Sequence, residues 1–210
     1  MLWTLIPAKS FRDAKQRLAP ILNEDERARL SAALLAHTIR TARAASGAQP
    51  IVVVAADAAV AETALAAGAD RAFVPKASGL NPQLAEAAAT VPPADPLLVL
   101  HADLPLLTPA DVTVLVETAG AVVIAPDHAG TGTNGLLHRT ADRFFAFGAD
   151  SYALHQAEAA ARNLAPAVVR RPGIAHDLDE PADWQHLGET LPELLTRLQG
   201  EPVHPGQHVI

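Results

Sequence analysis

The chain has 210 residues, half of them hydrophobic, and its 16 Lys and Arg against 23 Asp and Glu give a net charge of −7. This acidic balance argues against nonspecific nucleic-acid binding, and the absence of cysteine excludes disulfides, thiolate zinc sites and a cysteine nucleophile, which fits a reducing cytoplasm. The longest apolar runs, such as residues 51–56, are far shorter than the roughly 20 residues of a membrane span, so we expect no membrane or targeting segment.

Short apolar runs of strand length alternate with helical stretches along the chain. The predicted strands are Leu2–Ile6, Ile51–Ala55, Ala72–Val74, Leu97–Leu100, Ala121–Ile124 and Ala167–Val169. The predicted helices run over Glu24–Ala45, over Asp57–Ala67, from the Thr108–Asp111 start signal, and from Ser151 to Arg162. The capping-box pair Asn23 and Glu26 marks the start of the first helix, and Gly47 is placed to end it.

These apolar strands lack the alternation of polar and apolar residues that a half-exposed sheet shows, so they indicate a mainly parallel sheet covered on both faces. We therefore predict an α/β three-layer sandwich with a single domain over residues 1–200. An irregular tail rich in Pro, Gly and His is expected over Glu201–Ile210. Ligands of such sheets bind at the C-terminal ends of the strands. The loops that follow the strands are thus the candidate functional segments.

The loop after the first predicted strand carries four cations in nine positions, Lys9, Arg12, Lys15 and Arg17, in a chain that is otherwise acidic. Local positive charge at a strand end suits a polyphosphate. The segment matches neither a Walker loop nor a Gly-x-Gly-x-x-Gly turn, so Lys and Arg side chains would hold the phosphates instead of a glycine cradle. The solvated face of a short helix would explain the same residues.

Carboxylates follow the predicted strand Leu97–Leu100 and recur near the C-terminus. Asp103 is well placed to hold a hard divalent cation, and magnesium usually takes only one or two protein carboxylates together with substrate phosphates. We therefore expect Asp103 to meet Asp177 or Asp179 across the cleft at the strand ends. The alternative is structural, with Asp103 capping a turn and the later acids capping a helix before Pro181.

Glycine and hydroxyl residues gather after the strand predicted over residues 121–124. In residues 127–135, small side chains would let backbone N–H groups approach an anion, and Thr133 adds a hydroxyl donor. Gly148 and Ser151 lie at the expected start of a later helix, where anions bind well. A glycine-rich hairpin and an ordinary helix cap explain these segments almost as well. The histidines show no helical zinc-binding spacing and are assigned no role.

Six segments of the chain occur in the order found in the CofC/FbiD family, the guanylyltransferases of deazaflavin coenzyme F-420 biosynthesis. These segments are Pro7–Pro20, Gly79–Asn81, Asp103–Pro105, Gly130–Thr133, Phe147–Ser151 with His155, and Asp177–Asp183. The chain resembles this family over about residues 1–187. The resemblance implies a nucleotide-diphospho-sugar transferase fold of the MobA-like, GT-A type, and a cytoplasmic enzyme.

The resemblance also implies transfer of GMP from GTP to a small phosphorylated carboxylic acid, with release of pyrophosphate and with Mg²⁺ as cofactor. The acid is 2-phospho-L-lactate in archaeal members, and phosphoenolpyruvate or 3-phospho-D-glycerate in bacterial ones. Thirteen Arg, three Lys and abundant Ala resemble a bacterial composition, so phosphoenolpyruvate is the expected acceptor. No nucleic-acid or membrane partner is implied, and the protein is expected as a monomer or homodimer.

The family's motifs carry over to individual positions of this chain. On the nucleotide side, Lys9, Lys15 and Arg17 would contact the GTP phosphates. Lys9 and Arg17 would also stabilise the leaving pyrophosphate during catalysis. Gly79 and Asn81 would belong to the loop on the nucleotide side.

On the acceptor side, Asp103 would hold the metal and act in catalysis. Related transferases place the second metal ligand immediately before a Thr-Pro pair, where this chain has Glu180-Pro181, so Asp177 and Asp179 both stay candidates. The phosphorylated acid would be held by Thr133, Gly148 and Ser151.

Two other functions stay open from the sequence. One is a different nucleotidyltransferase of the same fold, which would act on molybdopterin or a sugar phosphate. The other is a noncatalytic regulator that binds a nucleotide without using the metal acids. Release of pyrophosphate from GTP with a panel of phosphorylated acids would separate all three.

Overall fold

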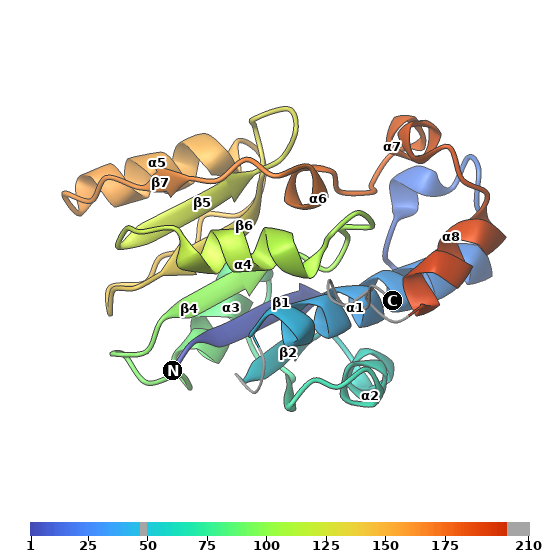
Figure 1. Cartoon of the computed structure of the whole chain (residues 1–210). Coiled ribbons are helices and arrows are strands. Elements are labelled where there is room, and N and C mark those ends of the chain that lie inside the picture. Colours follow the sequence, from blue (N-terminus) through green and yellow to red (C-terminus); the bar gives the residue numbers. More distant parts are fainter. Residues whose placement is uncertain (47–49, 201–210) are drawn as a thin grey trace, which may run out of the picture.

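The computed structural model of the protein describes residues 1–46 and 50–200, and Figure 1 shows a central sheet flanked by helices. The strands are β1 (Trp3–Ala8), β2 (Ile51–Ala55), β3 (Arg71–Phe73), β4 (Leu97–Leu100), β5 (Val122–Pro126), β6 (Thr133–His138) and β7 (Ala167–Val168). The helices are the 3-10 helix η1 (Gln16–Leu18) and the α-helices α1 (Glu24–Ser46), α2 (Ala58–Ala66), α3 (Leu80–Ala88), α4 (Pro109–Glu117), α5 (Ser151–Ala161), α6 (Pro172–Ala175), α7 (Pro181–Leu187) and α8 (Leu191–Gln199).

Within the described residues, seven strands form one sheet in the order β3-β2-β1-β4-β6-β5-β7. Strand β6 runs antiparallel to its neighbours β4 and β5, whereas the other pairings are parallel. Every residue of β2, β4 and β5 is buried, as is typical of strands covered on both faces. The predicted α/β class with a mainly parallel sheet is therefore confirmed.

The two strongest helix starts predicted from the sequence are also confirmed. At α1, the N–H of Asn23 donates to Glu26 at 2.8 Å and the N–H of Glu26 donates to Asn23 at 3.0 Å. Thr108 begins α4 with a capping box of the same kind. Gly47, expected to end α1, and the predicted tail over residues 201–210 lie outside the described residues. None of the helices in the described ranges is both long and apolar enough to cross a membrane.

Strand β6 differs from the expectation of a loop that continues to residue 135. All six of its residues are buried, and only residues 127–132 connect it to β5. A Cβ on Gly135 would lie 3.0 Å from Leu115 Cδ2 and 3.3 Å from Ala125 Cβ. This glycine therefore serves close packing against α4 and β5, and not a turn. Helices α3 and α8 are likewise absent from the elements predicted above.

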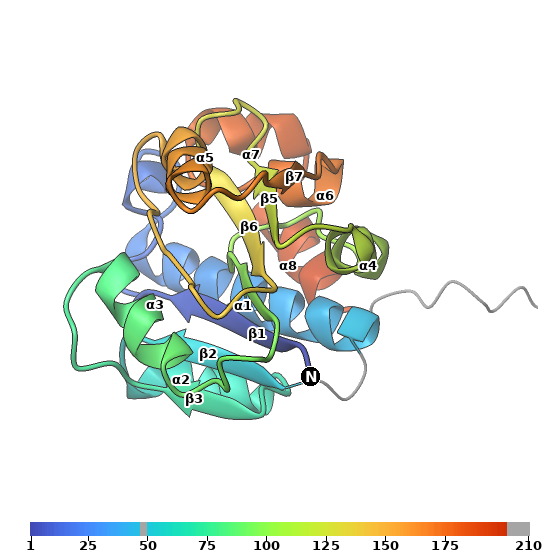
Figure 2. The same cartoon turned by 90° about the vertical axis from the view of Figure 1, so that its left-hand side faces the viewer.

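Helices cover both faces of the sheet, which confirms the three-layer arrangement. Helices α1 and α4 pack on one face through residues such as Leu35 and Leu115, together with α2 and α6. Helices α3 and α5 pack on the other face through residues such as Leu84 and Ala159. Figure 2 shows α3 and α5 on one side of the sheet and α4 on the other.

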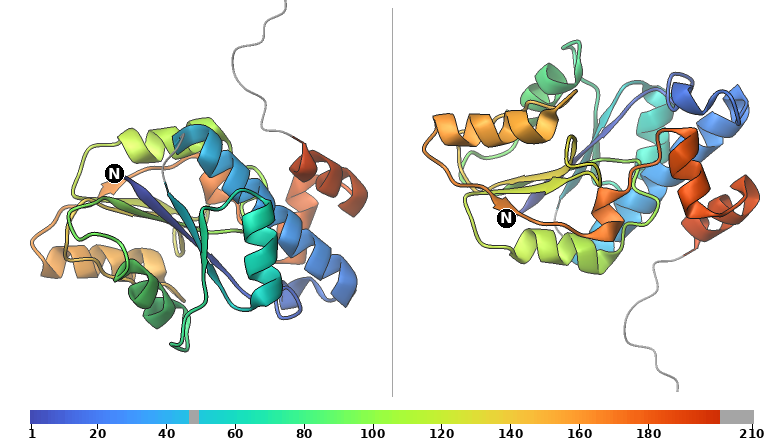
Figure 3. Two further views of the ribbon diagram at one scale, coloured as in Figure 1. Left: turned by 90° about the horizontal axis from the view of Figure 1, so that it is seen from below. Right: turned by 90° about the horizontal axis from the view of Figure 1, so that it is seen from above.

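A third apolar cluster joins parts of the chain that are far apart in sequence. Leu18 of η1 and Leu178 are both fully buried in it, where they pack with leucines of α1 and α8. Helix α8 lies alongside α1 (Figures 1 and 3). The cluster therefore places the loop after β1 beside residues 177–180.

Gly173 of α6 lies so close to the start of α4 that no side chain fits there. A Cβ on Gly173 would overlap Asp111 Oδ2 and come within 2.6 Å of Leu106 O. Asp111 is buried and accepts hydrogen bonds from Thr108 and Arg171, so its side chain cannot move away from an added Cβ without losing these bonds. We expect Gly173→Ala to lower the free energy of unfolding by about 1–3 kcal/mol, as overpacking does, in urea denaturation. A change below about 0.5 kcal/mol would contradict this account of the packing.

Candidate active site

The loops after β1 and β4 and residues 177–180 meet at the edge of the sheet where the parallel strands end. Between them lies a cleft of about 580 Å³. Lys9, Lys15 and Gly79, expected on the nucleotide side, line this cleft. Asp103 and Asp179, expected at the metal, line it as well. The structure thus brings together residues from four separate segments of the sequence.

A backbone hydrogen bond joins Asp103 to the later acids. The N–H of Leu178 donates to Asp103 O at 3.0 Å, so Asp177 and Asp179 flank the point of contact. Neither of these acids caps α7. The N-cap of α7 is Glu180, whose N–H donates to the Asp183 carboxylate at 2.7 Å. The same carboxylate accepts the N–H of Asp179 at 2.9 Å and so also fixes the backbone next to the site.

Lys15 forms the central ion pair of the cleft. Its Nζ lies 2.8 Å from Asp103 Oδ2 and 3.7 Å from Asp179 Oδ1, and its side chain is only 8% exposed. The backbone of Lys15 has a left-handed φ of 56°, which costs roughly 1–3 kcal/mol in a residue other than glycine. Such a conformation persists only where contacts compensate for it, and the two carboxylates provide them.

Arg17 forms an outer ion pair at the mouth of the site. Its Nη1 lies 3.3 Å from Asp179 Oδ2 and 2.9 Å from Glu180 Oε1. The Arg17 side chain is 68% exposed, so water screens both contacts and they contribute little to stability. An exposed cation of this kind can change partners readily.

The charges of the site push the pKa values of two neighbouring acids apart. Burial raises the pKa of Asp177, and the Asp103 carboxylate raises it further. Burial would also raise the pKa of Asp103, but the Lys15 ammonium outweighs it and holds that pKa below its ordinary value. The pKa of Lys15 itself is raised, because the surrounding carboxylates outweigh its burial. Asp103 is therefore anionic and Lys15 cationic at neutral pH.

The acids of the cleft offer the hard oxygen ligands that Mg²⁺ prefers. Asp103 Oδ1 is buried and accepts no hydrogen bond from the described part of the chain, so one carboxylate oxygen is available to a ligand. Among the described residues, no three His, Asp or Glu side chains already form a complete metal site. Magnesium often takes only one or two carboxylates and completes its shell with phosphates and water, and Asp103 with Asp179 or Asp177 fits that pattern.

The three residues expected around the acceptor lie at the start of β6 and around the start of α5, and His155 of α5 contacts Thr133. Thr133 begins β6, Ser151 begins α5, and Gly148 forms the turn before α5 with a φ of 134°. The N–H of Ala146 donates to His155 Nε2 at 3.0 Å, so the ring hydrogen is on Nδ1, which lies 3.0 Å from Thr133 Oγ1. Burial lowers the pKa of His155 to about 4, so the ring is neutral at neutral pH.

Asn81 has a different set of partners from those expected for a nucleotide-binding side chain. Its Nδ2 donates to Phe147 O at 2.9 Å, and its Oδ1 accepts the N–H of Phe147 at 2.8 Å. These two bonds tie the first turn of α3 to the turn that precedes Gly148. The Asn81 amide therefore connects the expected nucleotide and acceptor sides.

The sequence analysis assigned no role to Asn134 or His155, both of which contact site residues. Asn134 is buried, and its Nδ2 donates to Ile174 O at 2.9 Å and to Asp177 Oδ1 at 3.4 Å. A predicted strand over residues 133–138 would have pointed to Asn134, because it follows Thr133 directly. His155 occurs in the motif that carries the family resemblance, and only its partners were missing.

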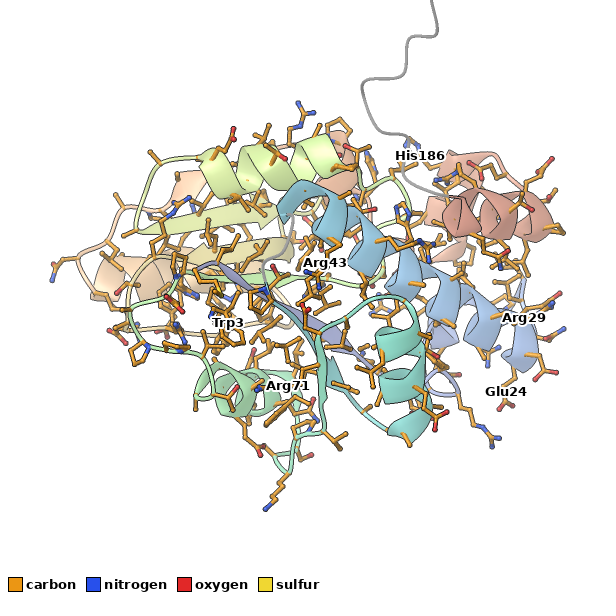
Figure 4. All side chains as sticks on the ribbon, turned by 60° about the horizontal axis from the view of Figure 1, so that its bottom comes forward. Trp3, Glu24, Arg29, Arg43, Arg71 and His186 are labelled. Carbon is orange, nitrogen blue, oxygen red and sulfur yellow. The ribbon has the colours of Figure 1, made fainter. Side chains whose placement is uncertain are left out.

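A smaller cavity of about 260 Å³ lies beside Asp177 and is lined by three stacked imidazole rings. The ring centroids of His128 and His176 are 5.0 Å apart, and those of His176 and His186 are 4.7 Å apart. Figure 4 labels His186, which belongs to α7. Burial and the two flanking rings lower the pKa of His176, so the central ring is neutral at neutral pH.

Comparison with known proteins connects this geometry to a family. Residues 2–191 match the family model described as guanylyl transferase CofC like. The chain is 39% identical over 192 residues to the phosphoenolpyruvate guanylyltransferase of Rubrobacter xylanophilus, and the alignment covers 89% of this chain and 93% of that protein.

Two solved structures share the fold. A Desulfovibrio desulfuricans protein assigned as a nucleotide-diphospho-sugar transferase has a TM-score of 0.67 at 16% identity, over 89% of this chain and 85% of that chain. A Mycobacterium tuberculosis protein in complex with manganese has a TM-score of 0.52 at 20% identity, over 89% of this chain and 97% of that chain. The expected nucleotide-diphospho-sugar transferase fold is thereby confirmed.

The closeness of Asp103 and Asp177 leads to a prediction about acid titration. In Asp103→Asn the negative charge beside Asp177 is lost, so Asp177 releases its proton more easily and its pKa falls. A titration of the side-chain carboxyl carbons by NMR measures the change. Asp142→Asn, which removes an exposed acid paired with Arg162, serves as the control and leaves the pKa of Asp177 unchanged. An unchanged or higher pKa of Asp177 in Asp103→Asn would show that the two carboxylates do not interact.

Proposed function

The chain belongs to the CofC family of guanylyltransferases, and from this membership we propose that it transfers GMP from GTP to phosphoenolpyruvate in coenzyme F-420 biosynthesis. The main support from the geometry is the meeting of Lys15 with Asp103 and Asp179 in one cleft. The choice of phosphoenolpyruvate follows the activity of the Rubrobacter relative. A cytoplasmic setting agrees with a chain that contains no cysteine.

In the proposed reaction, a phosphate oxygen of phosphoenolpyruvate attacks the α-phosphorus of GTP. The new bond joins that oxygen to phosphorus, and the bond from the α-phosphorus to the bridging oxygen breaks. Pyrophosphate leaves with the electron pair. The attacking oxygen belongs to a phosphate monoester that is largely ionised near neutral pH, so no strong general base is required. Positioning and neutralisation of charge supply the catalysis.

Lys9, Lys15 and Arg17 bind the phosphates of GTP in this proposal and neutralise the charge on the leaving pyrophosphate. Lys9 is exposed on the wall of the cleft, and Lys15 lies deeper in the same cleft. Gly79, with a φ of 88° at the start of α3, presents backbone to the nucleotide side. Asn81 supports that side through its bonds to the backbone of Phe147.

Asp103 and Asp179 hold Mg²⁺ in this proposal, since both line the cleft and Asp103 has a free carboxylate oxygen. Asp177 lies next to them with an elevated pKa and a contact from Asn134, which supports an outer position for it. When bound, the ion would supply positive charge that neutralises the reacting phosphates. The manganese complex of a protein with the same fold agrees with a divalent cation.

Thr133, Gly148 and Ser151 bind the acceptor in this proposal, because hydroxyl and backbone N–H groups are donors that suit a compact anion. His155 is a positioning residue here. Because its Nδ1 carries the hydrogen and donates to Thr133 Oγ1, the hydroxyl hydrogen of Thr133 is free to point toward another acceptor. A small phosphorylated acid suits this set of donors.

The substrate assignment predicts a specific pattern of pyrophosphate release. With GTP we expect rapid release in the presence of phosphoenolpyruvate, and slower release with 2-phospho-L-lactate or 3-phospho-D-glycerate. ATP and CTP with phosphoenolpyruvate serve as nucleotide controls and are expected to react poorly. Faster release with molybdopterin or a sugar phosphate than with every three-carbon acid would overturn the proposed acceptor.

A substitution of Ser151 tests the proposed acceptor side separately from the proposed nucleotide side. Loss of one hydrogen bond to a charged group costs roughly 1.5–3 kcal/mol, so we expect Ser151→Ala to raise the KM for phosphoenolpyruvate or lower kcat by about tenfold to a hundredfold. The affinity for GTP, measured by calorimetry without acceptor, is expected to stay within about twofold, because Ser151 does not contact GTP in this proposal. A twofold change corresponds to less than about 0.5 kcal/mol of binding free energy. Weakened GTP binding in Ser151→Ala would place this residue on the nucleotide side instead.

A further inference from the structure

Two cations expected to bind GTP phosphates are bonded in this structure to acids expected near the metal. Lys15 Nζ contacts Asp103 Oδ2 at 2.8 Å and Asp179 Oδ1 at 3.7 Å, while Arg17 contacts Asp179 and Glu180. The cations expected at the nucleotide and the acids expected at the metal therefore neutralise one another in this structure.

The Lys15 ammonium lies where a cation is most needed. It is almost fully buried, and it is surrounded by carboxylates that come from two distant segments, Asp103 after β4 and Asp177 and Asp179 before α7. Without a positive charge at this point, these acids would repel one another in a partly buried space. An ammonium and a divalent ion meet the same requirement, and the two cannot occupy one position together.

We propose that Lys15 is an internal cation that occupies the position of the divalent ion and moves to the nucleotide phosphates when metal and GTP bind together. This inference rests on the proposed function, because it takes the acids as metal ligands and the cleft as the GTP site. It adds that the two ligands are coupled through one side chain.

The coupling follows from the partners that each charged group keeps. If only a metal ion binds, Lys15 loses Asp103 and Asp179 and gains no anion in return. If only GTP binds, Lys15 turns to the phosphates and leaves the carboxylates unpaired beside a polyanion. When both bind, Lys15 pairs with phosphate and the carboxylates pair with the metal. Each ligand therefore raises the affinity for the other by the same factor.

The position of Lys15 allows this exchange. Lys15, Asp103 and Asp179 line the same cleft, so the ammonium changes partners without leaving it. A lysine side chain has a flexible four-carbon stem and three donors that rotate, which suits a group that alternates between two sets of anions. Arg17, exposed at the mouth, can make a parallel exchange from Asp179 to the phosphates.

Binding of Mn²⁺ alone to the full chain, followed by electron paramagnetic resonance, tests the proposal without any turnover. We expect Lys15→Met to bind Mn²⁺ about tenfold more tightly than wild type in the absence of nucleotide, within the usual range of coupling factors. Lys15→Arg keeps the positive charge and is expected to keep the weak affinity. Lys9→Met removes an equal charge from the same cleft, at a lysine with no ion pair among the described residues, and is expected to change little.

Several results would overturn the exchange. One such result is that Lys15→Met binds Mn²⁺ with the same affinity as wild type. Another is that Lys9→Met raises the Mn²⁺ affinity as much as Lys15→Met does, because such an effect would come from the net charge of the cleft and not from an exchange at Lys15. If Lys15→Met fails to fold, the wild-type protein provides the test. Its affinity for Mn²⁺, measured by water-proton relaxation, must be higher with the inert analogue guanosine 5′-(α,β-methylene)triphosphate present than the protein alone and the analogue alone account for. Absence of a ternary complex would remove the metal assignment as well, whereas pyrophosphate release would still report independently on the guanylyltransferase activity.

Discussion

The hydrogen bond from the Leu178 N–H to Asp103 O joins the loop after β4 to the acidic segment before α7, and the charged part of the cleft depends on this junction. The side chain of Leu178 is buried in the same apolar cluster as Leu18, the residue that comes immediately after Arg17 in the cationic loop. Leu178 therefore holds the end of β4 through its backbone and the loop after β1 through its side chain. Asp177 and Asp179 flank it, so their place beside Lys15 follows from apolar packing, which is insensitive to charge.

The cations and carboxylates of the cleft are positioned by this apolar packing. The protein is acidic, yet the cleft contains several cations, and the most buried of them, Lys15, already has carboxylate partners. An incoming polyphosphate therefore meets a nearly neutral site and not an open positive patch. In the exchange proposed for Lys15, this balance favours a nucleotide that arrives with a metal ion, because an anion or a cation alone leaves some buried charge without a partner.

The sequence predicted the elements whose signals are local. The capping box at Asn23 and the apolar runs of β2 and β4 identify their elements without the rest of the chain. Strand β6 lacks such a signal, because it contains Gly135, which in the sequence looks like part of a turn. The reason for this glycine is the close approach of Leu115 and Ala125, which becomes visible only in the tertiary structure. The family motif pointed to Asp103, Asp177 and Asp179, but their proximity in the structure depends on the packing of Leu178.

Side-chain partners were the least predictable part of the site. The motif placed Lys15 and Asn81 on the nucleotide side, while their bonds to Asp103 and Phe147 arise between segments 88 and 66 residues apart. A single sequence contains no information on which donor meets which acceptor over such distances. The tautomer of His155 is equally unpredictable from the sequence, because it follows from the hydrogen bond that the N–H of Ala146 donates to His155 Nε2.

The reversed direction of β6 has a consequence for how this fold diversifies. Because β6 runs antiparallel, its first residue, Thr133, lies at the same edge as the last residues of the parallel strands. The chain reaches it through a hairpin over residues 127–132, in which Asp127 accepts the N–H groups of Thr131 and Gly132. A hairpin of this kind can be lengthened, shortened or exchanged without moving β1, β2 or β4. In the proposed arrangement, with the acceptor at Thr133, the acceptor side can therefore change in evolution while the strands on the proposed nucleotide side stay as they are.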